Sequence, residues 1–156
     1  MQKTITLKPM TPQMHHVFFR EYRNDPDLYL NPADFYEYHY DEAKVDAYIQ
    51  RQAVKKRLCF AIMAEDEIVG EEKLCDITPE ASATLSITMK NDAFKDRGYG
   101  TQAEMLAVQY AFEVLNVPTV YADCVLTNAH SRHVLEKVGF VSIGQDEGKV
   151  YYKITK

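Results

Sequence analysis

The sequence has 156 residues, 46% of them hydrophobic, which is enough to bury one core, so we expect a single domain over residues 1–156. A formal net charge of −5, without a run of five lysines or arginines, argues against nucleic-acid binding and suits a cationic substrate such as an amine. The chain has no apolar run of the roughly 20 residues that a membrane span needs, and its three cysteines are widely spaced, so we expect a reduced cytoplasmic protein with no membrane partner.

The periodicity of apolar residues predicts eleven elements, starting with a strand at an N-terminus that does not resemble a signal peptide. In chain order they are a strand over roughly 3–9, helices over 12–23 and 42–53, strands over 58–63, 68–77 and 83–90, a helix over 103–114, a strand over 119–126, a helix over 129–138, and strands over 140–143 and 150–154. This order, βααβββαβαββ, indicates a mixed-sheet α/β or α+β domain.

Capping residues mark the first two helices. Thr11 is expected to cap the first helix, because a proline follows it at the first helical position, and Asp41 is expected to cap the second. His15 and His16 are expected on the surface of the first helix. Residues 25–40, rich in Tyr, Phe, Pro and Asp, have no clear period and predict no regular element.

A glycine-containing loop, Lys95 to Thr101 (Lys-Asp-Arg-Gly-Tyr-Gly-Thr), joins the strand over 83–90 to the next helix. Two glycines allow a tight turn and close approach to a ligand, while the free amides and dipole of a helix N-terminus attract an anion. The loop lacks the Gly-Lys-Ser/Thr of a Walker motif and the third glycine of a dinucleotide fingerprint. The loop predicts a binding site for a phosphate-bearing cofactor. The alternative is a plain turn, in which Gly-x-Gly before a helix is found equally often.

Two later segments complete a pattern with this loop: Asn128-Ala129-His130-Ser131-Arg132 and Leu135-Glu136-Lys137-Val138-Gly139-Phe140. In this order the three segments resemble the GNAT acyltransferase superfamily over nearly the whole chain. Their form looks like the branch of ribosomal-protein N-terminal acetyltransferases and small-amine acetyltransferases. The resemblance implies a GNAT-like, largely antiparallel seven-stranded sheet flanked by about four helices, with acetyl-CoA as cosubstrate.

The resemblance also implies contacts to acetyl-CoA. Lys95 stands where the family has Gln or Arg in its pyrophosphate loop, and Asp96, which would repel a pyrophosphate, is expected to point outward. Backbone groups near Ile87 and Met89 would pair with the pantetheine arm as an added strand does. The residues expected to bind the cofactor are Ile87, Met89, Lys95, Arg97, Gly98, Tyr99, Gly100, Thr101, Asn128 and Ser131.

The implied reaction is direct attack of an amine on acetyl-CoA. Ser131 falls where a hydroxyl lies near the thioester sulfur and is the candidate to protonate the thiolate, since Leu135 replaces the tyrosine acid of many members. Strand alternation places Glu72 on one face and Glu71 on the other, and Glu72 is the candidate base, directly or through water. The competing interpretation, which the pattern favours, is that both glutamates are solvated strand charges.

The segment between the first two helices often walls the acceptor site in this family. Here Tyr36, Glu37, Tyr38 and Tyr40 offer aromatic faces and a carboxylate for an amine. The other interpretation of these residues is packing on the core or a homodimer contact. His130 and His133 lie three residues apart but lack a third ligand, so no metal site is expected.

The predicted function is therefore an acetyl-CoA-dependent N-acetyltransferase acting on a primary amine, either the N-terminal α-amine of a peptide or protein or a small amine. The missing tyrosine acid leaves open a non-catalytic acyl-CoA-binding module that serves as a sensor or partner subunit. A phosphate-binding fold unrelated to the GNAT superfamily is a third possibility.

Overall fold

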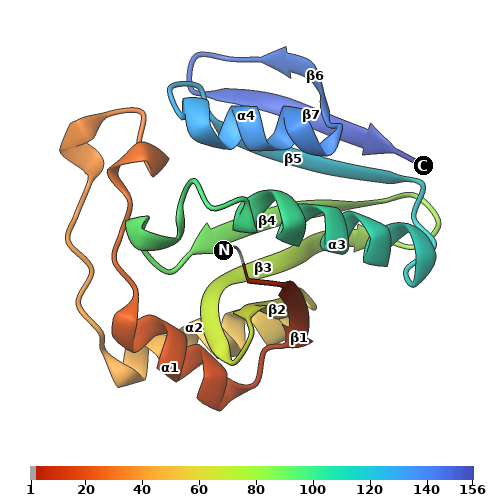
Figure 1. Ribbon diagram of the computed structural model, residues 1–156. Helices are drawn as coiled ribbons and strands as arrows, with labels where there is room; N and C mark the ends of the chain where they lie inside the picture. The colour runs from red at the N-terminus through yellow and green to blue at the C-terminus, as the bar shows by residue number, and fades with distance from the viewer. Residues whose placement is uncertain (1–2) are drawn as a thin grey trace.

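The computed structural model describes residues 3–156, which form a seven-stranded mixed sheet with helices packed on it (Figure 1). Its strands and helices are β1 (Ile5–Pro9), α1 (Pro12–Glu21), α2 (Glu42–Val54), β2 (Leu58–Ala64), β3 (Glu67–Thr78), β4 (Ser82–Met89), α3 (Tyr99–Glu113), β5 (Thr119–Val125), α4 (Ala129–Val138), β6 (Val141–Gln145) and β7 (Lys149–Thr155). The order confirms the predicted βααβββαβαββ succession. Met1 and Gln2, which begin the predicted N-terminal pattern, lie outside the described residues.

The sheet has the strand order β1-β2-β3-β4-β5-β7-β6. Neighbouring strands pair antiparallel except β4 and β5, which pair parallel. The predicted antiparallel meander and the final hairpin are thereby confirmed. A parallel pair needs a crossover connection, and α3 supplies it between β4 and β5.

Side-chain caps begin three of the helices. Thr11 accepts a hydrogen bond from the Met14 amide at 3.1 Å at the start of α1, and Asp41 accepts one from the Lys44 amide at 3.1 Å at the start of α2. Both predicted caps are therefore confirmed, and Asn128 caps α4 in the same way. The start of α3 differs, because Gly98 stands there with no side-chain cap among the described residues.

The main core lies between α3, α4 and the sheet. Ala103, Ala107 and Ala111 of α3 are each fully buried, and their small side chains let the helix lie close to the strands. Leu74 on β3, Val120 on β5, Phe140 and Tyr152 complete this layer. The core thus fixes α3 and its uncapped N-terminus against the middle of the sheet.

Helices α1 and α2 pack on each other, and α1 packs on β3. Between them, residues 22–41 run beside the end of β4 and on toward β5, and appear as the orange segment in Figure 1. This segment contains two short 3-10 turns, Pro26–Leu28 and Pro32–Asp34, which explains its lack of a helical or strand period.

The three cysteines, Cys59, Cys75 and Cys124, are free thiols on strands, as predicted. Across residues 3–156, no helix is both long enough and apolar enough to cross a membrane.

Candidate active site

The parallel strands β4 and β5 separate part of the way along the sheet. They pair only where Ser82–Thr84 meets Thr119–Tyr121, and no further β4–β5 pairing occurs in the described part of the chain. Beyond this point β4 continues beside β3 and β5 beside β7. The edge of β4 that faces β5 therefore has unpaired backbone groups from about residue 86 onward, available to a ligand.

The opening between β4 and β5 contains a hollow of about 360 Å³. This volume lies within the range of small-ligand sites. We call this hollow the strand cleft. The residues that line it come from β4, β5, α3 and α4 and include Thr84, Ser86, Ile87, Thr88, Glu104, Cys124, Asn128, Ser131 and Leu135. A smaller hollow adjoins it and extends to Met89 and Lys95. The cleft thus brings together residues from both motifs of the sequence, the β4–α3 loop and the start of α4.

The turn into α3 has the backbone geometry of an anion seat. Gly98 has a φ of 76°, a left-handed conformation that favours glycine. Because no side chain in residues 3–156 caps the helix, the first amides of α3 are left for another acceptor. Asp96 points outward, as expected, with 87% of its side chain exposed and its carboxylate 3.3 Å from Nδ1 of His130.

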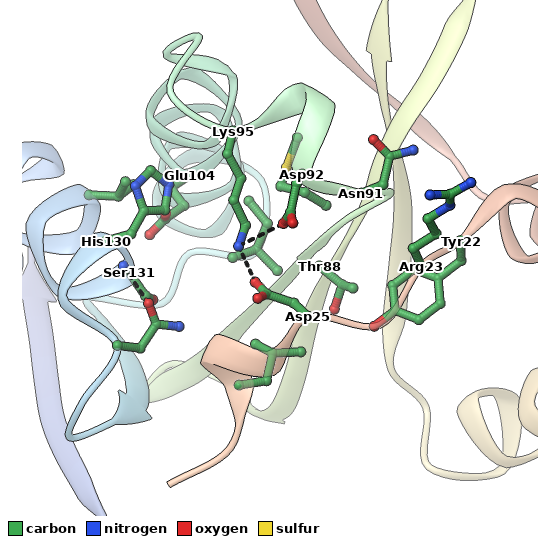
Figure 2. A pocket seen from close by; sticks show the side chains of 15 residues that line it. Tyr22, Arg23, Asp25, Thr88, Asn91, Asp92, Lys95, Glu104, His130 and Ser131 are labelled. Carbon is green, nitrogen blue, oxygen red and sulfur yellow. Dashed lines mark hydrogen bonds and ion pairs between the residues drawn. The ribbon is translucent and has the colours of Figure 1, made fainter. Parts of the chain in front are cut away.

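The ammonium group of Lys95 is already paired within the chain. It donates to Asp25 and to Asp92, the latter at 3.1 Å, and lies 3.7 Å from Asp27 (Figure 2). Burial lowers the pKa of Lys95, but the hydrogen bonds to Asp25 and Asp92 outweigh it and raise the pKa overall. Lys95 lies beside the predicted pyrophosphate seat, but any anion there competes with three carboxylates.

The N-terminal turn of α4 supplies Asn128 and Ser131 to the cleft. The side-chain oxygen of Asn128 accepts a hydrogen bond from the Ser131 amide at 3.1 Å, which fixes both residues where β5 ends. Figure 2 shows Ser131 among the side chains that line the adjoining hollow. Leu135, one turn further on, is buried and lines the cleft with its apolar side chain. Ser131 is therefore the hydroxyl that α4 presents at this point.

A second hollow, of about 380 Å³, lies on the α1–α2 side of the sheet. We call it the aromatic hollow, because Phe18, Phe19, Tyr22, Tyr36, Tyr38 and Tyr48 line it. Its charged lining residues are one acid, Glu71 on β3, and three bases: Lys44, Arg51 and Lys73. Thr88 lines both this hollow and the strand cleft, so the two spaces meet at β4.

The aromatic residues predicted for the acceptor site separate in space. Tyr36 and Tyr38 line the aromatic hollow, and the Tyr38 ring contacts Tyr22 with centroids 5.1 Å apart. Glu37 lines a neighbouring hollow between α1 and the loop after β4. Tyr40 lies elsewhere, with its hydroxyl 2.7 Å from Nδ1 of His16. Two of the four predicted residues thus share one hollow.

Glu71 is buried in a hydrogen-bonded group that sequence analysis missed. Nε2 of His15 donates to its carboxylate at 2.6 Å, and the Tyr48 hydroxyl donates to the other oxygen at 2.5 Å. Lys73 in turn donates to Tyr48 at 3.0 Å. The expected surface position of His15 is wrong, because His15 is 3% exposed and packed between α1, α2 and β3.

Three side chains of metal-ligating types meet at this hydrogen-bonded group. Among the described residues, potential ligand atoms of His15, Cys59 and Glu71 all lie within 4.8 Å of one another. His15 and Glu71 nevertheless hydrogen-bond directly, and burial, with the nearby Glu71 carboxylate, raises the pKa of Cys59 to about 11. This chemistry favours a hydrogen-bonded pair beside a protonated thiol.

Glu72 lies on the opposite face of β3 and is fully buried, at 0% exposure. Neither of its carboxylate oxygens has a hydrogen-bond partner in the part of the chain that the structure describes. The interpretation that Glu71 and Glu72 are solvated strand charges is wrong, since both are buried. Sequence alternation separated the two faces correctly, but it could not reveal what covers them.

Glu104 on α3 is the site residue that the sequence patterns did not indicate. It is 3% exposed, yet it lines both the strand cleft and the adjoining hollow. Burial raises its pKa to about 8, and burial together with Glu104 raises the pKa of Glu72 well above its usual range. The sequence did contain a signal for Glu104, because an acidic residue stands there among the apolar positions of the helix that face the sheet.

The family comparison agrees with this architecture. Residues 4–141 match the family model described as acetyltransferase (GNAT) domain. The chain is also similar to the probable N-acetyltransferase YjcK of Bacillus subtilis (strain 168), with 30% identity over 114 residues. That match covers 71% of this chain and 63% of the relative, less than two thirds of its length.

Solved structures share the fold over almost the full chain. Aminoglycoside acetyltransferase AAC(6′)-Ib in complex with coenzyme A has a TM-score of 0.79 and 16% identity, covering 98% of this chain and 95% of that one. Spermidine N-acetyltransferase from Vibrio cholerae, in complex with CoA and spermine, has a TM-score of 0.78 and 16% identity, covering 97% and 95%. At these identities the likeness concerns the fold.

Proposed function

The chain belongs to the GNAT acetyltransferase family, and from this premise we propose that it transfers an acetyl group from acetyl-CoA directly to a primary amine. The observation that carries the proposal is the separation of β4 from β5, which opens a cleft leading toward the uncapped N-terminus of α3. The relative from Bacillus subtilis is named as an N-acetyltransferase, and both solved relatives are complexes with coenzyme A.

The donor would lie in the strand cleft. Unpaired backbone groups of β4 near Ile87 and Met89 suit the amides of the pantetheine arm, as an added strand would. Amides between Arg97 and Thr101, including those of Gly98, Tyr99 and Gly100, would hold the pyrophosphate at the start of α3. Asn128 would complete the wall of the cleft.

The acceptor amine would occupy the aromatic hollow, which meets the cleft at Thr88. Tyr36 and Tyr38 offer π faces to a cation, and Glu71 offers the negative charge. Glu37 and Tyr40 lie outside this hollow and would contact only a longer substrate. This hollow suits a small amine, which Glu71 attracts while Lys44, Arg51 and Lys73 of the same lining repel its charged form.

In the reaction, the neutral amine attacks the thioester carbonyl, the C–N bond forms and the C–S bond breaks. Deprotonating a lysine-type amine of pKa about 10.4 costs about 4.6 kcal/mol at pH 7, whereas an α-amine of pKa about 8 costs about 1.4 kcal/mol. Glu71, which faces the aromatic hollow, is better placed to receive this proton than the fully buried Glu72. Ser131 would donate a hydrogen bond to the sulfur from the start of α4.

A thermal-shift titration with acetyl-CoA, followed by a CoA-release assay on a panel of amines, tests the proposal. Acetyl-CoA at 100 times its Kd should stabilise the fold by about 2.7 kcal/mol. The panel should include a polyamine, an aminoglycoside and a peptide with a free α-amine, and at least one should be acetylated. Binding without turnover on every amine would instead support the non-catalytic acyl-CoA-binding module.

A charged substitution locates the donor site. Gly100→Asp places a carboxylate at the start of α3 and should weaken acetyl-CoA binding at least 10-fold, because an anion seat then holds a like charge. The matched control, Gln109→Glu, adds the same charge to an exposed position on the same helix and should leave the affinity unchanged. Equal affinities for both variants would contradict the proposed seat.

A further inference from the structure

Two acids lie buried without partners beside the strand cleft. Oε1 of Glu104, and both carboxylate oxygens of Glu72, have no hydrogen-bond partner within residues 3–156. Burying a polar group without a hydrogen bond is costly, and most proteins avoid it. Their presence therefore calls for a role that satisfied polar groups do not have.

Glu104 lies within reach of a molecule bound in the cleft. It lines both the strand cleft and the adjoining hollow, together with Ile87, Thr88, Asn128 and Ser131. It extends from α3 into the hollow that Ser131 also lines (Figure 2). Glu72 lies deeper, on the strand position that pairs with Ile87, and is not among the residues that line the cleft.

The side chain of Glu104 carries a proton near neutral pH. Burial raises its pKa to about 8, and the pKa of Glu72 is raised well above the ordinary value by burial and by Glu104. A neutral carboxyl group that is shielded from water is a hydrogen-bond donor and an acid.

The other titratable groups near Glu104 come from each neighbouring element. From β5, Cys124 remains a thiol because burial raises its pKa. From α4, His130 is paired with Asp96, and from the loop after β4, Lys95 is occupied by Asp25 and Asp92. Asp123 of β5 and Lys149 of β7, which also line the strand cleft, pair with each other at 3.1 Å. Glu104 is thus the buried carboxyl group of the cleft lining, and its Oε1 has no partner within residues 3–156.

We propose that Glu104 gives its proton to the thiolate that leaves when the acetyl group is transferred. This proposal rests on the proposed function. The C–N bond forms, the C–S bond breaks with its electron pair on sulfur, and the Glu104 proton then forms the S–H bond. The proton released by the amine passes to Glu71 and from there to solvent, and solvent restores the proton of Glu104, so the step is balanced.

The kinetic test compares Glu104→Gln with wild type across pH. The amide keeps the size of the side chain but cannot transfer a proton, so kcat should fall by about 100-fold or more. The KM for acetyl-CoA should change less than threefold. Wild-type kcat should decline above about pH 8, where Glu104 ionises, and this decline should be absent in Glu104→Gln.

Two further variants control the comparison. Glu113→Gln makes the same change at an exposed position on the same helix and should retain the wild-type rate and pH profile. Glu104→Asp retains the acid and should recover part of the lost rate. A kcat for Glu104→Gln within threefold of wild type, with the decline above pH 8 still present, overturns the proposal.

A measurement without turnover separates this proposal from the proposed function. The ultraviolet absorbance of the thiolate reports ionisation of the thiol in bound CoA. In wild type, ionised Glu104 should hold this pKa higher than in Glu104→Gln, because two like charges repel. If the thiol pKa is the same in both proteins, the role of Glu104 is overturned even when amines are acetylated. If the thiol pKa differs, Glu104 lies close to the sulfur even when no amine is acetylated.

Discussion

Two adjacent glutamates on β3 have opposite surroundings. On the face toward α1 and α2, both oxygens of Glu71 accept hydrogen bonds, from His15 and from Tyr48. On the face toward α3, Glu72 is equally buried, and its oxygens have no partner among residues 3–156. The first carboxylate is held by an organised polar network, whereas burial and the nearby Glu104 raise the pKa of the second well above its usual range.

The comparison shows that burial alone does not define the role of an acid. A partnered carboxylate such as Glu71 keeps its position and can present negative charge to the aromatic hollow. Burial raises the pKa of both Glu72 and Glu104, and Glu104 lies at the strand cleft. The two faces of one strand thus suit the two ends of a proton-transfer reaction, loss from the amine and gain by the thiolate.

The largest expected effect is that of Glu71→Met. The substitution leaves Nε2 of His15 and the Tyr48 hydroxyl buried without their acceptor, and should reduce the free energy of unfolding by about 3–5 kcal/mol. Urea unfolding followed by circular dichroism measures this. The double variant with His15→Leu should cost less than the sum of the two single changes, and full additivity would contradict a coupled pair.

The next effect is a pH dependence of stability caused by Glu104. Its pKa is about 8 in the folded state and near the ordinary 4.5 when unfolded, so the folded state binds the extra proton between these values. Stability is highest at the acidic end of this window and falls as pH rises toward 8, by about 1.4 kcal/mol per pH unit.

Urea midpoints at pH 5.5 and 7.5 isolate this contribution when wild type is compared with Glu104→Gln. The variant should lose markedly less stability between the two pH values, because it lacks the titrating group. Parallel pH profiles for the two proteins would show that Glu104 has an ordinary pKa.

A smaller effect of opposite sign is expected for Glu72→Met. This substitution removes a buried carboxyl group without a partner, fills the space with an apolar chain, and should raise the free energy of unfolding by about 1–3 kcal/mol. The same urea measurement therefore gives neighbouring residues opposite signs for an identical substitution. Destabilisation of more than 1 kcal/mol would reveal a partner for Glu72.

The smallest effect on stability is expected for Thr11→Ala, which removes the side-chain cap at the N-terminus of α1. Loss of the hydrogen bond to the Met14 amide should cost about 1 kcal/mol of stability. Thr11 lies far along the chain from the uncapped start of α3, so acetyl-CoA affinity measured by calorimetry should stay within twofold of wild type. A large loss of affinity would link the two helix termini.

Local patterns were sufficient to predict most of the fold. Alternating apolar residues located the strands, and Thr11 and Asp41 marked the helix starts, because these signals depend on residues a few positions apart. Residues 25–40 were not assigned, because two prolines and several acids there form short 3-10 turns with no repeating face.

The candidate site was predictable only where it rests on short motifs. The loop ending in Gly98 and Gly100 and the capping position of Asn128 lie next to the opening between β4 and β5. The pairing of Lys95 with Asp25 was not predictable, because 70 residues separate the two in sequence. Glu104 was overlooked for a similar reason, since the strands that bury it lie in distant segments.

The sequence by itself determined the order of elements, the helix caps and the glycine turn into α3, because each arises from contacts between near neighbours in the chain. The tertiary structure alone decided that His15 meets Glu71, 56 residues away, and that Glu72 meets no partner in residues 3–156. Protonation depends on solvent exclusion and on which distant groups are brought within hydrogen-bonding distance, and both are properties of the packed sheet and its helices.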